Sequence, residues 1–509
     1  MRLAFSLAAV ALCTACSTPP PIDAPETVDL GRVATTPSQA GDAYYAAAKT
    51  VMDARAEARG VEPAKNVILF VGDGMGVSTI TAGRIYAGQK RGLDGESYRL
   101  AMETLPWSAL SKTYAHDAQV SDSAATATAM VAGMKTNARM VGVTREAAFS
   151  NCASAQGRGS DNLFELAEAQ GLATGVVTTT RLTHATPASV YAEAPNRNWE
   201  HDRDVGGSAC PDIASQLIGW PAGDGLEIAL GGGREKFLPV ETRDPEYADQ
   251  LGGRGDARDL GAEWAAKSDA HETVYDLAAL RAVDIAGGAR VLGLFEPSHM
   301  KYEADRGEDP AGEPSLEEMT RLAISRLQQD EDGFVLMVEG GRIDHAHHGG
   351  NAYRALEDLD AFDQAVAAAL EMTSAEDTLI IVTADHSHTL TIQGYQTRNN
   401  PILGKAAFGP GALARAGDGK PYTTLSYANG PGAVCAGAED ACPARPDLSE
   451  VDTEARDFRQ QALIPAGSET HAGEDVAIFA RGPSAHLVSG VMEQNEIFHV
   501  MAKAAGLIE

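Results

Sequence analysis

The chain has 509 residues, 44% of them hydrophobic, with 41 basic against 71 acidic residues and a formal net charge of -30. Such a length and hydrophobic content are typical of one large folded core and argue against a chain that is disordered along most of its length. The acidic excess repels nucleic acid and anionic lipid headgroups, which excludes both as general surface partners; an anionic substrate would need local positive charge.

The first 16 residues have the pattern of an export signal. Arg2 precedes an apolar run, Leu3 to Leu12, that is too short to span a bilayer, and the following residues through Cys16 form a small-residue cleavage site. Cys16 and the Pro-rich stretch after it resemble a bacterial lipoprotein junction with lipid on Cys16; ordinary cleavage after Ala15 is the alternative, because Cys13 stands where such signals usually carry Leu. We therefore expect an exported protein, periplasmic or lipid-anchored to the cell envelope.

Four cysteines remain once the signal is removed: Cys152, Cys210, Cys435 and Cys442. An even number of cysteines in an oxidising compartment predicts two disulfides. The pair Cys435 and Cys442 is the clearest candidate, because these two residues lie close together in the sequence.

The body of the chain alternates between two kinds of segment. Apolar runs rich in β-branched residues, typical of buried strands, occur at 67–71, 174–179, 227–230, 291–295, 334–338, 378–383 and 476–480. Stretches with apolar residues at helical spacing lie between them, at 162–170, 316–328 and 353–370. This alternation predicts an α/β fold with a central, mostly parallel sheet and helices on both faces.

One long segment interrupts this pattern. From about Gly394 to Ser468 the chain is rich in Gly, Pro and polar residues, which predicts an inserted subdomain. We therefore expect a signal peptide at 1–16, a Pro-rich linker at 17–40, a main α/β domain formed by 41–393 and 469–509, and an insertion at 394–468.

Polar side chains follow the predicted strands. Because ligands bind outside the carboxyl ends of the strands in open α/β sheets, these residues predict one shared cleft. They are Asp73, His184, Glu296, Glu339, Asp385 and His386.

Two of these strand ends carry residues typical of metal ligands. In the segment FVLMVEGGRIDHAHH, Asp344 and His348 would share one face of a helix. A carboxylate and an imidazole together suit zinc, which accepts oxygen and nitrogen ligands. Exposed histidines would be the plainer interpretation of that segment alone, but the second cluster, TADHSH with Asp385, His386 and His388, needs the same cleft.

Asp73 and Ser123 complete the set of candidate residues. Asp73 leaves its strand in VGDGMG, where glycines allow the backbone to approach an ion or a phosphate closely. Ser123, in VSDSAATATAM, is expected to open a helix whose N-terminal dipole faces it. It could simply cap that helix. As a nucleophile it would need activation, and metal is the better explanation because the chain has no G-x-S-x-G motif.

Nine separated blocks together resemble the alkaline phosphatase family, from about Pro63 to Gly506. They are VGDGMG, DSAATATA, TTTRLTHATP, NRNW, GGGREKF, GLFEPSHMKYE, VEGGRIDHAHH, TADHSH and ETHAGEDVAIFARGP. The chain is more similar to the animal-type branch, although Thr186 and the Ala-Ala after Ser123 follow the bacterial pattern. The resemblance implies that the insertion is a crown-like subdomain and that the protein forms a homodimer.

The resemblance also implies a site with two zinc ions and one magnesium. The first zinc would be held by Asp344, His348 and His471, and the second by Asp73, Asp385 and His386 beside the nucleophile Ser123. Asp73 would also reach toward magnesium, completed by Thr186 and Glu339. Arg197 would grip two phosphate oxygens as a planar fork. His388 would lie behind these ligands, as would His184 and His345, which stand where some family members have Asp and Lys and so imply altered surroundings of magnesium and water.

A fourth, calcium-like site is implied at Glu246, the carbonyl of Phe295, Glu296 and Glu313. Glu313 replaces the Asp of the animal-type pattern, and acidic residues exposed to solvent are the alternative interpretation. Tyr395 resembles a tyrosine that reaches the partner's active site in the family's dimers; a buried core tyrosine is the alternative.

The implied reaction is the hydrolysis of phosphate monoesters through a phosphoserine on Ser123, with net retention of configuration at phosphorus. Related metal-dependent phosphodiesterases or sulfatases are rivals, but a sulfatase needs its nucleophile in a Cys- or Ser-x-Pro-x-Arg context, and Ala-Ala-Thr-Ala follows Ser123. A lipid-tethered metal or phosphate binder without activity is the non-enzymatic alternative.

Overall fold

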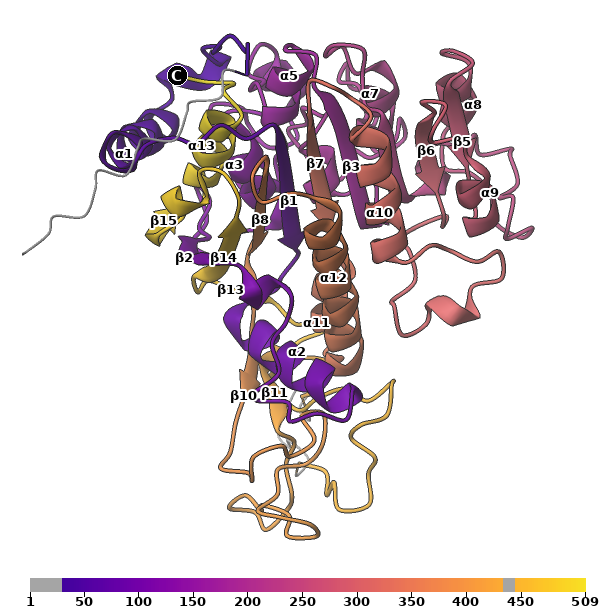
Figure 1. The fold of residues 1–509 in the computed structure, drawn as a ribbon. Helices are drawn as coiled ribbons and strands as arrows, with labels where there is room; N and C mark the ends of the chain where they lie inside the picture. Colours follow the sequence, from indigo (N-terminus) through magenta and orange to yellow (C-terminus); the bar gives the residue numbers. More distant parts are fainter. Residues whose placement is uncertain (1–29, 434–444) are drawn as a thin grey trace, which may run out of the picture.

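The computed structural model describes residues 30–433 and 445–509 (Figure 1). Within them, a ten-stranded sheet has the order β15-β2-β14-β8-β1-β7-β3-β4-β6-β5. Its strands are β1 (Asn66–Gly72), β2 (Trp107–Lys112), β3 (Ala173–Arg181), β4 (Ile228–Gly232), β5 (His271–Val274), β6 (Arg290–Leu294), β7 (Phe334–Glu339), β8 (Thr378–Ala384), β14 (Val476–Arg481) and β15 (Gly490–Glu493). All neighbours pair in parallel except β14, which runs antiparallel to β2 and β8. The predicted mostly parallel α/β sheet is confirmed.

The strand β1 shows why helices cover both faces of the sheet. Val67, Leu69 and Val71 are buried in one apolar core, and Ile68 and Phe70 are buried in the other. Because successive side chains of a strand point to opposite faces, a strand that is apolar throughout must be covered on both sides.

The helices divide between these two cores. On one face lie α1 (Ala43–Arg59), α3 (Ser123–Ala132), α5 (Leu163–Glu168), α7 (Ile213–Gly219) and α13 (Glu496–Ala504). On the other lie α10 (Leu316–Leu327) and α12 (Ala352–Met372). The remaining helices are α2 (Val77–Lys90), α4 (Cys152–Ala155), α6 (Ala185–Ala188), α8 (Leu260–Ala265), α9 (Leu277–Ala282) and α11 (Arg342–His348).

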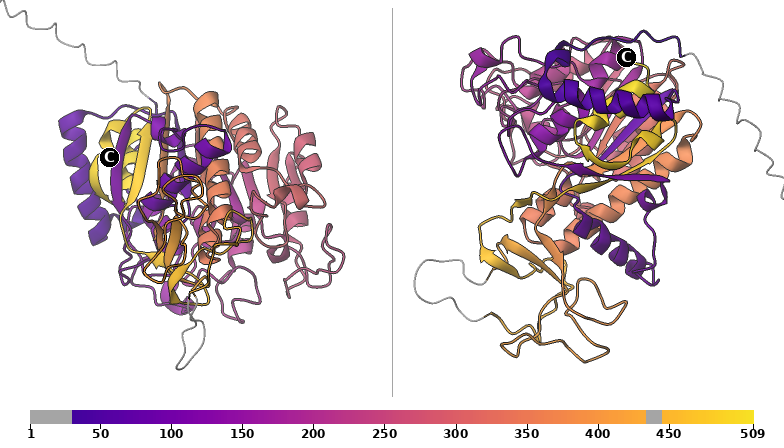
Figure 2. Two further views of the ribbon diagram at one scale, coloured as in Figure 1. Left: turned by 90° about the horizontal axis from the view of Figure 1, so that it is seen from below. Right: turned by 90° about the vertical axis from the view of Figure 1, so that its left-hand side faces the viewer.

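A small lobe extends beyond the carboxyl ends of the central strands, at the bottom of Figure 1 and of the right-hand view in Figure 2. Its three-stranded sheet joins β10 (Leu390–Ile392), β11 (Leu425–Gly430) and β12 (Ala462–Pro465). The predicted insertion, 394–468, contains β11 and β12, whereas β10 precedes it. The exact domain boundaries stay a prediction.

A short two-stranded sheet connects the two parts of the chain that flank this lobe. It pairs β9 (Ser387–His388) with β13 (His471–Ala472), so that His388 lies opposite His471. Residues far apart in the sequence are thereby placed side by side at the base of the lobe.

Cys152 and Cys210 form a disulfide, 58 residues apart in the sequence. Cys435 and Cys442 lie outside the described residues, as does Cys16 with the predicted signal. Among the residues that are described, none of the helices has both the length and the apolar character needed to cross a bilayer.

Lys135 is buried beside the β2 edge of the sheet and makes stability depend on pH. Its Nζ donates to the carbonyl of Tyr114 at 2.8 Å and lies 3.3 Å from Glu493 Oε2, with the side chain 1% exposed. Burial lowers the pKa of Lys135 from 10.5 to about 8, although Glu493 opposes the shift. Between these two values the unfolded chain holds the proton that the folded chain has lost, so the free energy of unfolding rises with pH through this window.

We expect Lys135→Met to remove that dependence. From about pH 8 to 10.5, the wild-type protein should gain up to about 3 kcal/mol relative to the variant. Denaturant unfolding of both proteins at the two ends of the window measures the difference. A constant difference across the window would mean that the Lys135 pKa is not lowered by burial.

Candidate metal centre

The carboxyl ends of three adjacent strands bring the predicted acidic residues together. Asp73 follows β1, Glu339 ends β7 and Asp385 follows β8, and each side chain is completely buried. His386, next to Asp385, is also completely buried. The shared cleft expected from the strand ends is present for these residues and for His184, which clusters with Asp73 and Glu339, but Glu296 lies in a separate cluster with Glu246 and Asp309.

Ser123 is the first residue of α3, and it does not cap the helix. The cap is Asp122, whose carboxylate accepts from the backbone N–H of Ala124. The Ser123 hydroxyl instead lies 3.2 Å from both carboxylate oxygens of Asp73 and 3.2 Å from His386 Nε2. The capping interpretation therefore fails, and Ser123 faces the cluster of acidic residues.

A first metal-binding cluster joins α11 to the paired strands β9 and β13. One potential ligand atom from each of its four residues lies within 4.8 Å of the others. His348 Nε2 is 3.4 Å and His471 Nε2 is 3.3 Å from Asp344 Oδ1. Asp344 and His348 share one face of α11, as their spacing predicted. The cluster consists of Asp344, His348, His388 and His471.

Backbone carbonyls orient two of these imidazoles. His348 Nδ1 lies 2.6 Å from the carbonyl of Glu469, and His471 Nδ1 lies 2.8 Å from the carbonyl of Ser121. Since a carbonyl only accepts, each Nδ1 carries the proton and each Nε2 keeps its lone pair for a metal.

His388 differs, because each of its two ring nitrogens contacts a carboxylate. Its Nε2 lies 2.6 Å from Asp344 Oδ1 and its Nδ1 lies 2.5 Å from Glu469 Oε2. Burial alone would lower the pKa of His388, but the two carboxylates raise it to about 9. His388 therefore orients Asp344 from behind, the position that the sequence analysis assigned to it.

A second cluster lies next to Ser123 and contains Asp73, Asp344 and His386. Asp385 Oδ2 is 3.3 Å from His386 Nε2, and its Oδ1 accepts from the backbone N–H of Gly74 at 3.0 Å. Gly74 has a φ of +68°, and a Cβ there would lie 2.4 Å from Cδ2 of His388. Only glycine fits this turn, and the group that it approaches closely is the His388 ring rather than the ion or phosphate suggested by the VGDGMG motif.

A third cluster contains Asp73, His184 and Glu339. Thr186 Oγ1 and Glu339 Oε1 are both buried without a hydrogen-bond partner. Since buried polar atoms nearly always have a partner, two oxygens that lack one beside a carboxylate cluster are suited to binding a cation.

The carboxylates buried together in the cleft also favour the binding of cations. Burial raises the pKa of Asp73 well above its usual value, and three neighbouring carboxylates raise it further. Burial likewise raises the pKa of Glu339 to about 7 and raises that of Asp385. Burial opposes ionisation of Asp344 too, but His388 and His471 outweigh it and hold the Asp344 pKa well below its usual range. Bound cations would allow every one of these groups to ionise.

Arg197 is positioned beside Ser123. Its Nη1 donates to Asp122 at 2.8 Å, and its Nη2 lies 2.9 Å from His184 Nε2. Two partners thus hold the guanidinium plane next to the residue that precedes Ser123. His184 also packs edge-on against His345, whose Nδ1 lies 2.9 Å from Arg342 Nη1.

Two residues near the site were not predicted from the sequence, His299 and Glu469. The ring of His299 lies against both His345 and His184, with centroids 4.2 and 5.2 Å apart. His299 and Glu469 both occur in blocks that carried the resemblance, GLFEPSHMKYE and ETHAGEDVAIFARGP, but neither follows a strand end directly.

At the calcium-like position the structure differs from the expected ligand set. Glu246, Glu296 and Asp309 form the cluster, and Glu313 is not part of it. Glu313 Oε1 instead accepts from the backbone N–H of Lys301 at 2.9 Å. The loop before α10 brings Asp309 to the carboxylates of Glu246 and Glu296. Nothing in the sequence indicated that Asp309, rather than Glu313, would lie there. Phe295 is buried between β6 and Glu296.

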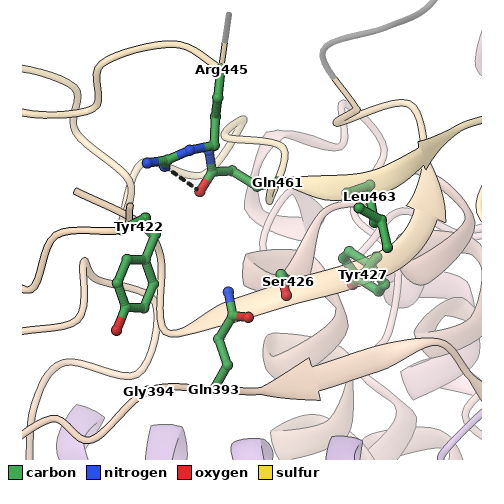
Figure 3. Close-up of a pocket in the computed structure, with 10 residues that line it drawn as sticks. Gln393, Gly394, Tyr422, Ser426, Tyr427, Arg445, Gln461 and Leu463 are labelled. Carbon is green, nitrogen blue, oxygen red and sulfur yellow. Dashed lines mark hydrogen bonds between the residues drawn. The ribbon is translucent and has the colours of Figure 1, made fainter. Parts of the chain in front are cut away.

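Tyr395 is 91% exposed, so the alternative of a buried core tyrosine is wrong. A nearby cavity of about 400 Å³ in the small lobe is lined by Gln393, Tyr422 and Arg445, among others (Figure 3). None of its lining residues belongs to the metal clusters above. This cavity is therefore separate from the metal centre.

Comparisons with known proteins find one family over most of the chain. A family model described as alkaline phosphatase matches residues 64–507. The tissue-nonspecific alkaline phosphatase of Gallus gallus is 45% identical over 452 residues, covering 87% of this chain and 84% of that protein. The alkaline phosphatase of Gadus morhua is 43% identical over 454 residues, covering 87% and 92%.

Solved structures support the fold. The alkaline phosphatase of Thermus thermophilus superposes with a TM-score of 0.63 at 26% identity, covering 88% of this chain and 92% of that one. The enzyme of the Antarctic bacterium TAB5 has a TM-score of 0.58 at 23% identity, with coverage of 88% and 99%.

Proposed function

The chain belongs to the alkaline phosphatase family, and from this premise we propose that the cleft around Ser123 hydrolyses phosphate monoesters to an alcohol and inorganic phosphate. One observation carries the proposal: the Ser123 hydroxyl points away from the capping position and lies 3.2 Å from Asp73 and from His386. A serine among metal-ligating side chains, with an arginine beside it, is suited to phosphoryl transfer.

The residues present fit two zinc ions and one magnesium. The mixed carboxylate and imidazole sets, Asp344 with His348 and His471, and Asp73 with Asp385 and His386, suit zinc. The oxygen donors Asp73, Thr186 and Glu339 suit magnesium, and the unpartnered oxygens of Thr186 and Glu339 support an ion between them. When bound, the zinc ions would supply Lewis acidity that lowers the pKa of the serine hydroxyl and of a water.

The chain's own residues perform the following steps. Ser123 Oγ gives up its proton and attacks phosphorus in line with the alcohol oxygen; the bond between that oxygen and phosphorus breaks, the alcohol leaves with a proton, and a phosphoserine forms. Water then gives up a proton and attacks phosphorus on the side opposite the Ser123 oxygen, which leaves and regains a proton. Each displacement inverts the configuration, so the two together retain it. Arg197, held by Asp122 and His184, donates to two phosphate oxygens and stabilises their charge in both steps.

The test compares a nitrophenyl phosphate monoester with the matching diester and the matching sulfate. We expect the monoester to be hydrolysed faster than the diester by orders of magnitude, because Arg197 and the metal sites are arranged around a group with several free anionic oxygens. A dominant diesterase or sulfatase rate would contradict the proposal and favour one of the rival activities. No turnover of any ester would favour the non-enzymatic binder.

A calcium ion held by Glu246, Glu296 and Asp309 is a further part of the proposal, with the Phe295 carbonyl as the fourth ligand. Oxygen ligands of this kind suit calcium. Asp309 Oδ2 and Glu313 Oε2 are buried without partners, which supports a cation nearby. Lys301 Nζ lies 3.1 Å from Glu296 Oε1 and would have to share that carboxylate.

The assembly and location of the protein are also proposals. An exposed Tyr395 on the small lobe supports a homodimer in which this side chain reaches the partner's cleft. Leu463 and Ile464 of the same lobe are 82% and 57% exposed, which supports an apolar contact surface there. The signal pattern in the sequence supports export and lipid attachment at Cys16.

A further inference from the structure

Glu469 contacts one of the three residues proposed to hold the first zinc, His348, and is linked to a second, Asp344, through His388. It lies two residues before His471, at the point where the chain returns from the small lobe, and it is 1% exposed. Its carboxylate does not belong to the metal clusters. Glu469 contacts His348 and His388 instead, on sides of their rings that face away from the proposed zinc.

The backbone of Glu469 determines which nitrogen of His348 can bind metal. The Glu469 carbonyl accepts from His348 Nδ1 at 2.6 Å, and the Glu469 N–H donates to the His348 carbonyl at 3.0 Å. This reciprocal pair fixes the imidazole ring and places its proton on Nδ1. Nε2 therefore faces Asp344 with a free lone pair.

The side chain of Glu469 acts on Asp344 through His388. Glu469 Oε2 lies 2.5 Å from His388 Nδ1, and His388 Nε2 lies 2.6 Å from Asp344 Oδ1. The second oxygen, Oε1, accepts from the N–H of Thr389 at 2.7 Å and from its hydroxyl at 2.5 Å. Every oxygen of the carboxylate is thus committed, which fixes the rotamer of His388 and the direction in which Asp344 points.

The small lobe holds this segment in place. Asn429, on β11, accepts from the N–H of Thr470 at 3.0 Å and donates to its hydroxyl at 2.9 Å. Gly430 packs so closely that an added Cβ would lie 3.1 Å from Cβ of Glu469. The position of Glu469 therefore depends on the lobe as well as on the main domain.

We propose that Glu469 is a positioning residue of the first zinc site, acting on His348 through its carbonyl and on Asp344 through His388. The inference rests on the proposed function, because it concerns the same site. Residues that orient metal ligands in this way typically contribute about 10- to 100-fold to metal affinity.

The test uses Glu469→Gln, which preserves size and leaves the backbone contacts to His348 intact. The amide has only one acceptor oxygen, so it cannot accept from His388 and from Thr389 at once. We expect zinc affinity at one of the sites to fall about 10- to 100-fold, measured by equilibrium dialysis of the metal-free protein against zinc buffers. Excess zinc should restore the lost occupancy.

Glu474→Gln is the matched control. Glu474 lies five residues later, and its Oε1 accepts from Ser387 Oγ at 2.9 Å, next to His388, without contacting Asp344 or a proposed ligand. Zinc affinity should stay unchanged in this variant. Equal zinc affinity in Glu469→Gln and wild type, or an equal loss in both variants, would overturn the positioning role.

A melting temperature of the metal-free protein separates positioning from a general effect on folding. We expect metal-free Glu469→Gln to melt close to the metal-free wild type while binding zinc more weakly; a lower melting temperature with unchanged zinc affinity would overturn the proposal. The wild-type titration distinguishes the two hypotheses: a wild type that binds no zinc contradicts the proposed function, whereas tight binding that the variant retains contradicts only the role of Glu469.

Discussion

Ser123→Ala is expected to lower the turnover of a nitrophenyl phosphate monoester by about three orders of magnitude or more, the scale seen when a nucleophile is removed from a catalytic unit. Without Oγ no phosphoserine can form, and Arg197 and the metal sites would have to promote direct attack by water. The fold should be unaffected, because Asp122 caps α3 and alanine favours a helix at least as much as serine does.

Metal content is the second readout of this variant. Each proposed metal keeps its carboxylate and imidazole ligands when Ser123 is replaced, so elemental analysis should give the same zinc and magnesium content as wild type. Ser121→Ala is a suitable control, since the Ser121 hydroxyl contacts only the Asp122 carbonyl and the substitution keeps the Ser121 backbone carbonyl that accepts from His471. Unchanged turnover in Ser123→Ala would remove Ser123 from the mechanism.

Removal of metal by a chelator is expected to abolish activity, and zinc together with magnesium should restore it. The buried carboxylates of the cleft explain why. Asp73, Glu339 and Asp385 crowd together with raised pKa values, and the oxygens of Thr186 and Glu339 have no partner. Without cations this arrangement can neither activate a hydroxyl nor bind a phosphate.

Chelation should also make stability fall as pH rises. The folded pKa of Glu339 is about 7, above its ordinary value of 4.5, so the metal-free folded state favours the protonated acid. Its contribution is fully present below the unfolded value and is lost as pH rises through about 7. Thermal melts of metal-free and reconstituted protein, in parallel with activity and elemental analysis, measure both effects.

Zinc alone and magnesium alone serve as controls for the reconstitution. We expect neither to restore full activity, because the two kinds of site differ in their donors. Full activity in protein that has been shown by elemental analysis to lack metal would contradict the proposed mechanism, and Ser123 would then need another source of activation.

The class of fold and several residues of the cleft could be predicted from the sequence alone. Strands apolar on both faces, such as β1, can be stable only inside a covered sheet, and the seven predicted runs are all strands of the structure. The strands β2, β5 and β15 were missed. They lie at or near the edges of the sheet, where one face is partly exposed and the sequence needs no continuous apolar run.

The same reasoning located the ligands that follow strand ends. Asp73, Glu339, Asp385 and His386 have to meet because parallel strands end at one edge of the sheet. Asp344 and His348 have to share a face because they are four residues apart on a helix. Local periodicity and strand order were therefore sufficient for these positions.

The contacts made by loops could not be predicted from the sequence and are known only from the folded chain. Whether Ser123 caps α3 or faces Asp73 depends on Asp122, which takes the cap. Two further contacts arise in segments without helical or strand periodicity. One loop brings Asp309 to the calcium-like cluster, and the pairing of β9 with β13 places Glu469 behind His388. Such contacts join residues distant in the sequence, and their geometry follows from how the whole chain packs.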